Sequence, residues 1–254
     1  MNYKMNTYCY FLSLVLSISC NQTENTSEIS SICGPRADFQ NVDTFVPKKN
    51  SDFTKAFIDK HQRPVGKVSF KLVGFPYKSC TGTLLKDDYF LTAGHCMSKI
   101  QIDKISVIFN YHKNKRNQSI EYKVEYIAEV NYKKDVDYAI LKLANNPTKE
   151  FGYTKLSNEE IKPFDSVAII QHPKGQTKQV ATGSVKSVKS GSNGKNTVAY
   201  RYADTLKGSS GAGVLNTKGE LIAIHTTGEC TRDPFNSANE GMTIESIRAI
   251  SKIL

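Results

Sequence analysis

Three short segments of the chain carry residue types that could together hydrolyse an acyl bond. His95 stands in residues 91–96, Leu-Thr-Ala-Gly-His-Cys, where small residues let the chain turn tightly after a strand. Asp137 directly precedes an apolar stretch, and Ser210 lies within residues 208–213, Gly-Ser-Ser-Gly-Ala-Gly. A serine hydroxyl is a poor nucleophile near neutral pH, so it needs a base within hydrogen-bond reach and a third group that holds this base in the correct tautomer. Ser210, His95 and Asp137 would supply these three parts.

The small residues around Ser210 could provide a fourth part, a binding site for the negative charge that develops on the attacked carbonyl oxygen. Glycine permits backbone angles that other residues avoid, and such angles would point the amides of Gly208 and Ser210 at this oxyanion. A nucleophile, a base, an orienting acid and an oxyanion site need no metal or other cofactor, and we expect none.

Taken together, the three segments resemble the signatures of the trypsin-like serine peptidases, in the family order His, Asp, Ser. The stretch 80–83, Cys-Thr-Gly-Thr, precedes the histidine as it does in that family, and the resemblance covers residues 66–254. It implies that Ser210 attacks, that His95 shuttles the proton and that Asp137 orients the imidazole. It further implies two six-stranded β-barrels with this triad at their seam, and a Cys80–Cys96 bridge beside the histidine.

Two neighbouring residues compete with members of this triad. Asp135 could be the orienting acid, but Asp137 directly abuts the apolar strand, as the family requires. Ser209 could be the nucleophile, but only Ser210 is followed by glycine. Digestive-type relatives carry an Asp at the position of Ser209, where it pairs with the amine that zymogen cleavage creates. This chain lacks that carboxylate, so a trypsin-type activation switch is not expected.

Other departures from the digestive pattern favour the bacterial glutamyl-endopeptidase branch of the family. The sequence Ile-Val-Gly-Gly is missing from the expected mature start, while residues 171–173 read Gln-His-Pro and Ala212 stands within the serine motif. His172 in this stretch is expected to be a turn residue with no catalytic role.

The residue preference before the scissile bond is open between two pockets. In glutamyl endopeptidases a Thr five residues before the nucleophile and a His fifteen after it line the pocket, and Thr205 and His225 stand at these offsets. A hydroxyl and an imidazole can hydrogen-bond a carboxylate and so lower the cost of burying it. Asp204 is the rival, because trypsin carries its basic-selecting Asp six residues before the serine. Thr226 and Gly228 match the edge segment that pairs with the substrate backbone.

These residues predict a serine endopeptidase that works through an acyl-enzyme, with cleavage after Glu or Asp as the first hypothesis. Cleavage after Arg or Lys is the alternative within this class, and a non-catalytic pseudoprotease or binding module is the alternative outside it. The expected partner is a protein or peptide substrate, and we expect a monomer.

The segments that position these residues read as short strands. Val68, Phe70 and Leu72 alternate with polar residues, and about ten such runs are separated by Gly, Asn, Pro and Lys, which favours an all-β antiparallel sandwich or barrel pair. The other runs are 84–92, 105–111, 122–130, 138–143, 167–171, 183–188, 197–202, 213–215 and 221–225. Only the end, 244–254, has a clear helical period, and 38–63 is polar with a weak helical period.

Length and charge bear on the number of domains and on the class of partner. At 254 residues and 39% hydrophobic composition, the chain suits one catalytic unit, which we place at 64–254. The 34 Lys and Arg outnumber the 24 Asp and Glu for a net charge of +10, but the lysines are scattered between apolar runs. With no aromatic-basic motif beside this charge, we expect no nucleic-acid partner.

The first twenty residues read as a signal peptide, with Lys4 before an apolar run that is too short for a membrane span. Residues 17–20, Ser-Ile-Ser-Cys, resemble a bacterial lipobox, although its first position is usually Leu. A bacterial precursor could therefore be anchored through a lipid on Cys20, whereas a eukaryotic one would not be. The polar residues 21–63 are expected to form a tether and N-terminal segment of a secreted or periplasmic protein.

Four cysteines remain after the signal, Cys33, Cys80, Cys96 and Cys230, and an even number in an exported chain suggests two disulfides. Four cysteines allow three pairings. A bridge across a hairpin favours Cys80 with Cys96, which leaves Cys33 with Cys230. No Cys or His pair has zinc-ligand spacing, so no metal site is expected.

Overall fold

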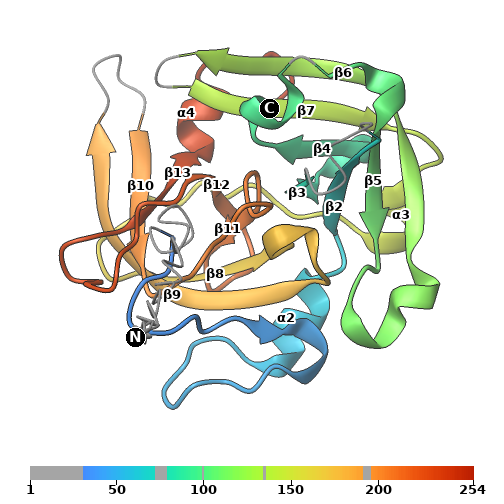
Figure 1. The fold of residues 1–254 in the computed structure, drawn as a ribbon. Coiled ribbons are helices and arrows are strands. Elements are labelled where there is room, and N and C mark those ends of the chain that lie inside the picture. The colour runs from blue at the N-terminus through green and yellow to red at the C-terminus, as the bar shows by residue number, and fades with distance from the viewer. Residues whose placement is uncertain (1–30, 72–78, 99, 134–135, 191–195) are drawn as a thin grey trace, which may run out of the picture.

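The computed structural model describes residues 31–71, 79–98, 100–133, 136–190 and 196–254, which form two β-barrels lying side by side (Figure 1). The predicted signal segment with Cys9 and Cys20, the tether up to residue 30, Leu72 and Asp135 lie outside the described residues. No helix within the described ranges is both long and apolar enough to cross a membrane.

The first barrel closes from six antiparallel strands in the order β2-β3-β4-β7-β6-β5. These strands are β2 (Val65–Phe70), β3 (Ser79–Leu84), β4 (Tyr89–Thr92), β5 (Ile105–Phe109), β6 (Ile120–Lys133) and β7 (Val136–Leu143). The short helix α3 (Pro147–Phe151) follows β7 and packs Phe151 against Phe109 and Tyr122 of the barrel core.

The second barrel closes from six antiparallel strands in the order β8-β9-β10-β13-β12-β11, because β11 pairs with β8 and β8 pairs with β9. These strands are β8 (Ser166–Gln171), β9 (Gln179–Ser190), β10 (Asn196–Arg201), β11 (Gly213–Leu215), β12 (Leu221–Thr227) and β13 (Asn239–Thr243). The predicted pair of six-stranded barrels is confirmed. A two-residue strand, β1 (Gln40–Asn41), adds to the edge of β9.

Strand β7 shows how one alternating pattern serves both the barrel interior and the seam. Successive side chains of a strand point to opposite faces. Ala139, Leu141 and Leu143 are buried inside the first barrel, whereas Tyr138 and Ile140 join the apolar cluster between the barrels. Because both faces are covered, β7 can hold Asp137 at a fixed place beside the seam.

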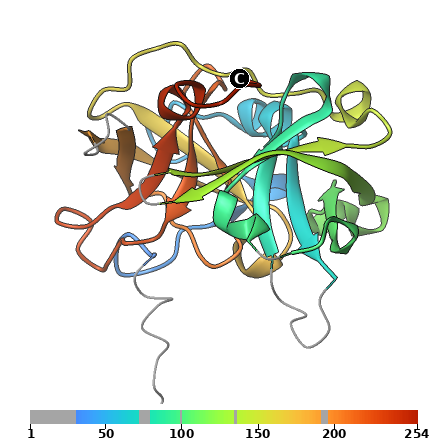
Figure 2. The same cartoon turned by 90° about the horizontal axis from the view of Figure 1, so that it is seen from above.

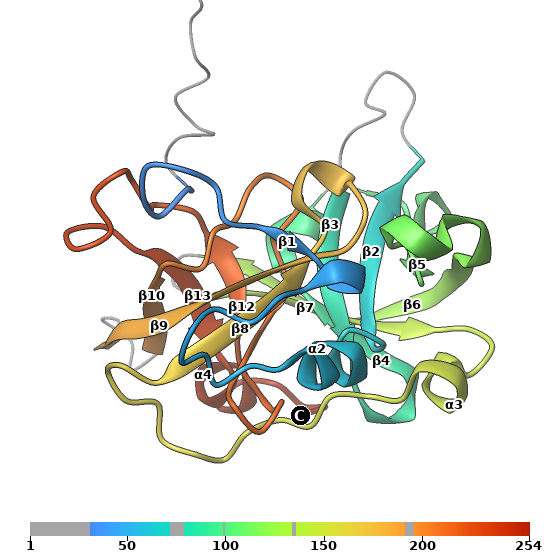
Figure 3. The ribbon, with the colours of Figure 1, turned by 90° about the horizontal axis from the view of Figure 1, so that it is seen from below.

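The N-terminal segment packs on the barrels instead of trailing away from them. Helix α2 (Lys55–His61) begins after Thr54, whose hydroxyl accepts a hydrogen bond from Phe57 N and so caps the helix. Ile58 and the preceding Phe53 are buried in the cluster between the barrels, and Figure 3 shows α2 lying between them. Burying such a side chain stabilises the fold by roughly 1.5–3 kcal/mol.

Two predicted elements differ from the structure. The single strand expected at 84–92 is the end of β3, a 3-10 turn and β4, because Asp87 and Asp88 adopt positive φ values of 58° and 57° and reverse the chain. The helix expected at 244–254 is only α4 (Ile244–Arg248). It stops early because Glu129 of β6 accepts hydrogen bonds from the side chain of Ser251 and the amide of Lys252.

The connection between the barrels, residues 144–165, runs across the face that carries the C-terminus (Figure 2). Leu156 in this connection bridges to Leu221 of β12.

Candidate active site

His95 lies in a 3-10 turn, η3 (Gly94–Met97), directly after β4, and Asp137 is the second residue of β7. The carboxylate of Asp137 holds His95 twice. Its Oδ1 accepts the backbone N–H of His95 at 2.8 Å, and its Oδ2 lies 2.7 Å from Nδ1 of the ring. A carboxylate only accepts hydrogen bonds, so Nδ1 carries the proton and Nε2 of the neutral imidazole is the basic nitrogen.

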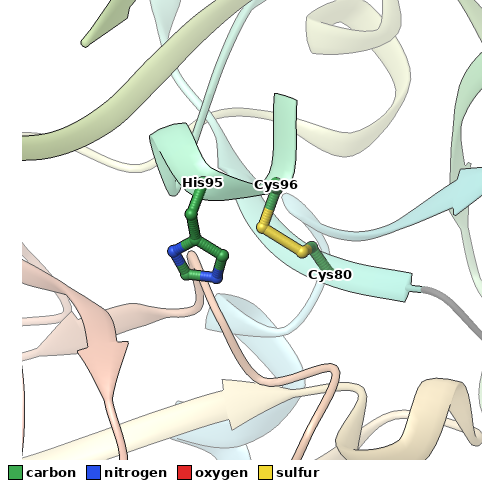
Figure 4. A group of neighbouring side chains, drawn as sticks. All are labelled: Cys80, His95 and Cys96. Carbon is green, nitrogen blue, oxygen red and sulfur yellow. A yellow bond between two sulfur atoms is a disulfide. The ribbon is translucent and has the colours of Figure 1, made fainter. Parts of the chain in front are cut away.

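A disulfide braces the turn that carries His95. Cys80 of β3 is bonded to Cys96, next to the histidine, as Figure 4 shows. The two sulfurs and a ring nitrogen of His95 lie within 4.8 Å of one another, which is close enough for metal ligands. Both sulfurs are joined to each other, however, so they offer no thiolate, and this trio does not fit a metal site. The second predicted disulfide, Cys33–Cys230, is also present.

Ser210 lies in the turn between β10 and β11, and hydrogen bonds from the first barrel fix this turn in place. Thr81 of β3 donates its amide to the carbonyl of Ser210 at 2.9 Å and its hydroxyl to the carbonyl of Gly208 at 2.8 Å. Ser210 is partly exposed, whereas Ser209 is fully buried and accepts a hydrogen bond from the amide of Leu206. Of the two serines, only Ser210 is therefore accessible to a substrate.

The glycine after the serine allows the two barrels to meet closely. Gly211 has φ +83°, and a Cβ atom there would lie 2.2 Å from Oγ1 of Thr92 and 2.6 Å from the amide of Ala93. Ala93 is two residues before His95, so this contact brings the serine turn beside the histidine turn. The structure thus brings the three predicted catalytic residues to the seam between the barrels.

The proposed oxyanion turn has an equally tight backbone. Gly208 has φ +97°, and a Cβ atom there would lie 2.7 Å from the carbonyl oxygen of His172. His172 itself is fully buried, with its amide bonded to the hydroxyl of Thr81 and its ring facing the carbonyl of Gln176. It lies in the turn after β8, where its carbonyl packs against the backbone of Gly208. This position agrees with the turn role expected for it.

The pocket residues expected from the sequence lie on both sides of this turn. Thr205 is fully buried, and its hydroxyl has no hydrogen-bond partner among the described residues. His225 of β12 is 3% exposed, and its Nδ1 lies 2.5 Å from the hydroxyl of Tyr200. Thr226 and Gly228, at the end of β12, are half-buried.

Burial keeps the His225 ring uncharged. Loss of solvation, aided by the nearby His95, lowers the pKa of His225 to about 3. Burial also raises the pKa of Tyr200 well above its usual value, so its hydroxyl keeps its proton. If this hydroxyl donates to Nδ1, Nε2 of His225 carries the ring proton. The ring also has a backbone hydrogen bond with Glu240, which opposes the lowering of its pKa.

Asp204 does not present a free carboxylate that could bind a basic substrate side chain. It is 1% exposed, and its two oxygens accept the backbone amides of Cys33 and Asp38, each at 2.7 Å. Burial raises the pKa of this carboxyl to about 6, against the effect of the two amide hydrogen bonds. The carboxylate anchors the N-terminal segment, which sequence reasoning did not anticipate because its partners lie more than 160 residues away.

Sequence reasoning also missed two neighbours of the site. Tyr200, the partner of His225, reads as an ordinary core residue of a strand and gave no signal. Tyr132 of β6 is 60% exposed, and its ring centroid lies 5.9 Å from that of His95.

The neutral, buried His225 predicts a loss of stability in acid. Because its pKa is about 3 in the folded protein and about 6.5 in the unfolded chain, the unfolded chain binds more protons between these values. The free energy of unfolding should therefore fall as pH drops from 6.5 towards 3, by up to about 1.4 kcal/mol per pH unit from this group. Urea unfolding at pH 4 to 7 should show a flatter pH dependence for His225→Gln than for the parent. The control His61→Gln, on the half-buried ring of α2, should keep most of the slope, and equal slopes in all three proteins would contradict the prediction.

Comparisons with known proteins show the family of this chain. The family model described as lysyl endopeptidase, C-terminal domain, matches residues 20–239. A curated protein from Plasmopara viticola, "Secreted RxLR effector protein 73", is 30% identical over 176 residues, or 62% of this chain. The chain spans 43% of the length of that relative.

Several solved structures share the fold. The active form of the Rv3671c protease from M. tuberculosis has a TM-score of 0.58 at 14% identity, over 76% of this chain and 81% of that one. The serine endoprotease from Yersinia pestis has a TM-score of 0.60 at 17% identity, over 76% and 63%. The HtrA-type protease AlgW, solved with a tripeptide, has a TM-score of 0.59 at 15% identity, over 76% and 60%. At these identities the likeness shows the fold alone.

Proposed function

We propose, on the premise that this chain belongs to the family of the lysyl endopeptidase C-terminal domain, that it is an exported serine endopeptidase. The observation that carries this proposal is that the turn of Ser210 lies beside the turn of His95, where Asp137 contacts the backbone and ring of His95 at 2.8 and 2.7 Å. This contact fixes the tautomer that leaves Nε2 free to act as a base. Two disulfides support an oxidising compartment, and the curated relative is named a secreted protein.

The proposed reaction proceeds through an acyl-enzyme. Oγ of Ser210 attacks the carbonyl carbon of the substrate while Nε2 of His95 takes the hydroxyl proton. The resulting oxyanion accepts the amide hydrogens of Gly208 and Ser210. When the C–N bond breaks, His95 returns the proton to the leaving amine. A water molecule, deprotonated by His95, then attacks the acyl carbon, and Ser210 regains its proton as the acid leaves.

For the residue before the scissile bond, we propose Glu or Asp. The buried hydroxyl of Thr205 has no partner within the described part of the chain, and such a group is costly to leave unpaired unless a ligand or water reaches it. The neutral ring of His225 could be a second donor. Together these groups would bind a carboxylate without a buried positive charge.

Cleavage after Lys or Arg is the second candidate, favoured by the description of the matching family as lysyl endopeptidase. The carboxylate that the sequence offers for it is Asp204. Its oxygens accept the amides of Cys33 and Asp38, which leaves it less able to bind a substrate cation.

The cleavage-site profile of the purified protein on a peptide library, read by mass spectrometry against Ser210→Ala, tests both candidates. We expect cuts after Glu, and His225→Gln should lower kcat/KM for Glu substrates by roughly 10- to 100-fold, because one hydrogen bond to a charged group is lost. His61→Gln serves as the matched control. Cuts after Lys or Arg would transfer the preference to the second candidate, equal losses on all substrates would make His225 structural, and the absence of Ser210-dependent cuts would favour a pseudoprotease.

A further inference from the structure

The N-terminal segment 31–38 is fastened to the wall of the proposed specificity pocket. Cys33 is disulfide-bonded to Cys230, three residues after the end of β12, and the amide of Gly34 donates to the carbonyl of Thr231 at 3.0 Å. Asp204, next to the pocket residue Thr205, accepts the amides at both ends of the short stretch from Cys33 to Asp38. Figure 3 shows this blue segment running along the second barrel to β1.

Ser31 is the first described residue of this segment, and its backbone is hydrogen-bonded to the wall. Ser31 is buried, with 9% of its surface exposed. Its carbonyl accepts the amide of Thr205 at 3.1 Å and the side-chain amide of Asn239 at 3.1 Å. Asn239 also donates to the carbonyl of Ala203. Ser31 is thus linked to both neighbours of Asp204, directly to Thr205 and through Asn239 to Ala203.

The side chain of Ser31 occupies the space that Gly228 leaves open. A Cβ atom built on Gly228 would lie 2.2 Å from Oγ and 3.0 Å from Cβ of Ser31. No real Cβ atom approaches another atom so closely, so the two positions share one volume. The glycine therefore does not leave a gap in the wall, because a residue almost 200 positions away in the sequence fills it.

We propose that Ser31 is a specificity-determining residue of the protease, supplied to the substrate pocket by the N-terminal segment. This inference rests on the proposed function, which assigns Thr205 and His225 to that pocket, and on the expected place of Gly228 in the substrate-pairing edge segment beside it. Ser31 narrows the pocket at Gly228 and keeps its lining polar, so that compact side chains with a hydrogen-bonding end are favoured over long or aromatic ones. The disulfide and Asp204 hold the segment in place before the substrate arrives, so ordering it adds no cost to binding.

Because Ser31 and a side chain at position 228 would occupy the same space, substitutions at both positions test the role of Ser31. Gly228→Ala alone should lower kcat/KM at least tenfold, because the new methyl group displaces Ser31. Ser31→Gly alone should raise kcat/KM for substrates with Arg or Phe before the scissile bond at least tenfold relative to Ala substrates. In the double variant Ser31→Gly/Gly228→Ala, most of the loss should be recovered, because the methyl group then takes the vacated space. Ala37→Gly, an exposed position of the same segment, is the control for a merely loosened chain and should keep the parent profile.

Two further measurements separate this inference from the proposed function. Labelling by a small fluorophosphonate reports on the triad without filling the pocket, and it should be unchanged in Ser31→Gly. Calorimetric binding of peptides ending in Glu, Arg or Phe to the same variants on a Ser210→Ala background reports on the pocket without turnover. Absent labelling with altered peptide preference in Ser31→Gly would overturn the proposed function alone. An unchanged preference in Ser31→Gly, or strictly additive effects of the two substitutions, would overturn the role of Ser31.

Discussion

Replacing Ser210 with alanine is expected to lower kcat by about 10⁵- to 10⁶-fold and to abolish covalent labelling by a fluorophosphonate. The alanine keeps the backbone of the turn, which Thr81 fixes through the carbonyls of Ser210 and Gly208, but it removes the attacking oxygen. The melting temperature should therefore change little. Stopped-assay kinetics and gel-based labelling of the purified proteins measure both effects.

Ser209→Ala is the matched control for this substitution. Ser209 is fully buried and its hydroxyl accepts the amide of Leu206, so its loss should cost stability, on the order of 1 kcal/mol, while labelling persists. Labelling that survives in Ser210→Ala and disappears in Ser209→Ala would move the nucleophile to Ser209.

Replacing Asp137 with asparagine should lower kcat about 10⁴-fold while the fold is retained. The carboxylate accepts two hydrogen bonds from His95, one from the backbone and one from Nδ1. Asparagine has a single acceptor oxygen, and if this stays on the backbone amide, its NH₂ group faces Nδ1. The ring proton then moves to Nε2, which can no longer take the proton of Ser210. The kcat of this variant and its rate of fluorophosphonate labelling should fall together.

The structure contains a matched control for this effect as well. Asp43 accepts hydrogen bonds from Nδ1 of His112 at 2.5 Å and from the amide of Asn114 at 2.8 Å. Asp43→Asn disturbs a pair of the same chemistry and should reduce stability with little change in kcat. Equal losses of kcat in both variants would show that Asp137 acts only through the stability of the fold.

The pair of Asp43 and His112 also shows what sequence could and could not provide. A His bonded to an Asp is not distinctive, and no spacing rule would select Asp137 with His95 over Asp43 with His112. The joint occurrence of three motifs in one order favours Asp137 and His95 as the catalytic pair. Strand alternation predicted most strands and an antiparallel sandwich or barrel pair, because it reflects which side chains are buried. The choice of two six-stranded barrels came from the family resemblance.

The features that the sequence did not predict share a different cause, which is contact between residues far apart in the sequence. Strand β13, Asn-Glu-Gly-Met-Thr, has no alternating pattern and exists because β10 and β12 flank it. Helix α4 stops where Glu129 binds the following residues, and Asp204 is bound by amides of the N-terminal segment. Local patterns carry no information on such partners, so the length of the helix and the anchoring role of Asp204 could not be predicted.

The strand pairing β1–β9 and the Cys33–Cys230 bond also constrain the order in which the protein can be made. The N-terminal residues of β1 and Cys33 are attached to the second barrel, yet their partners are synthesised more than a hundred residues later, up to 197 for the disulfide. The first barrel, with His95 and Asp137, uses only strands between Val65 and Leu143 and can assemble early. Loop closure over so long a stretch is slow, so the serine turn should mature last. A nascent chain would therefore carry a base and its orienting acid well before it could cleave anything, its own neighbours included.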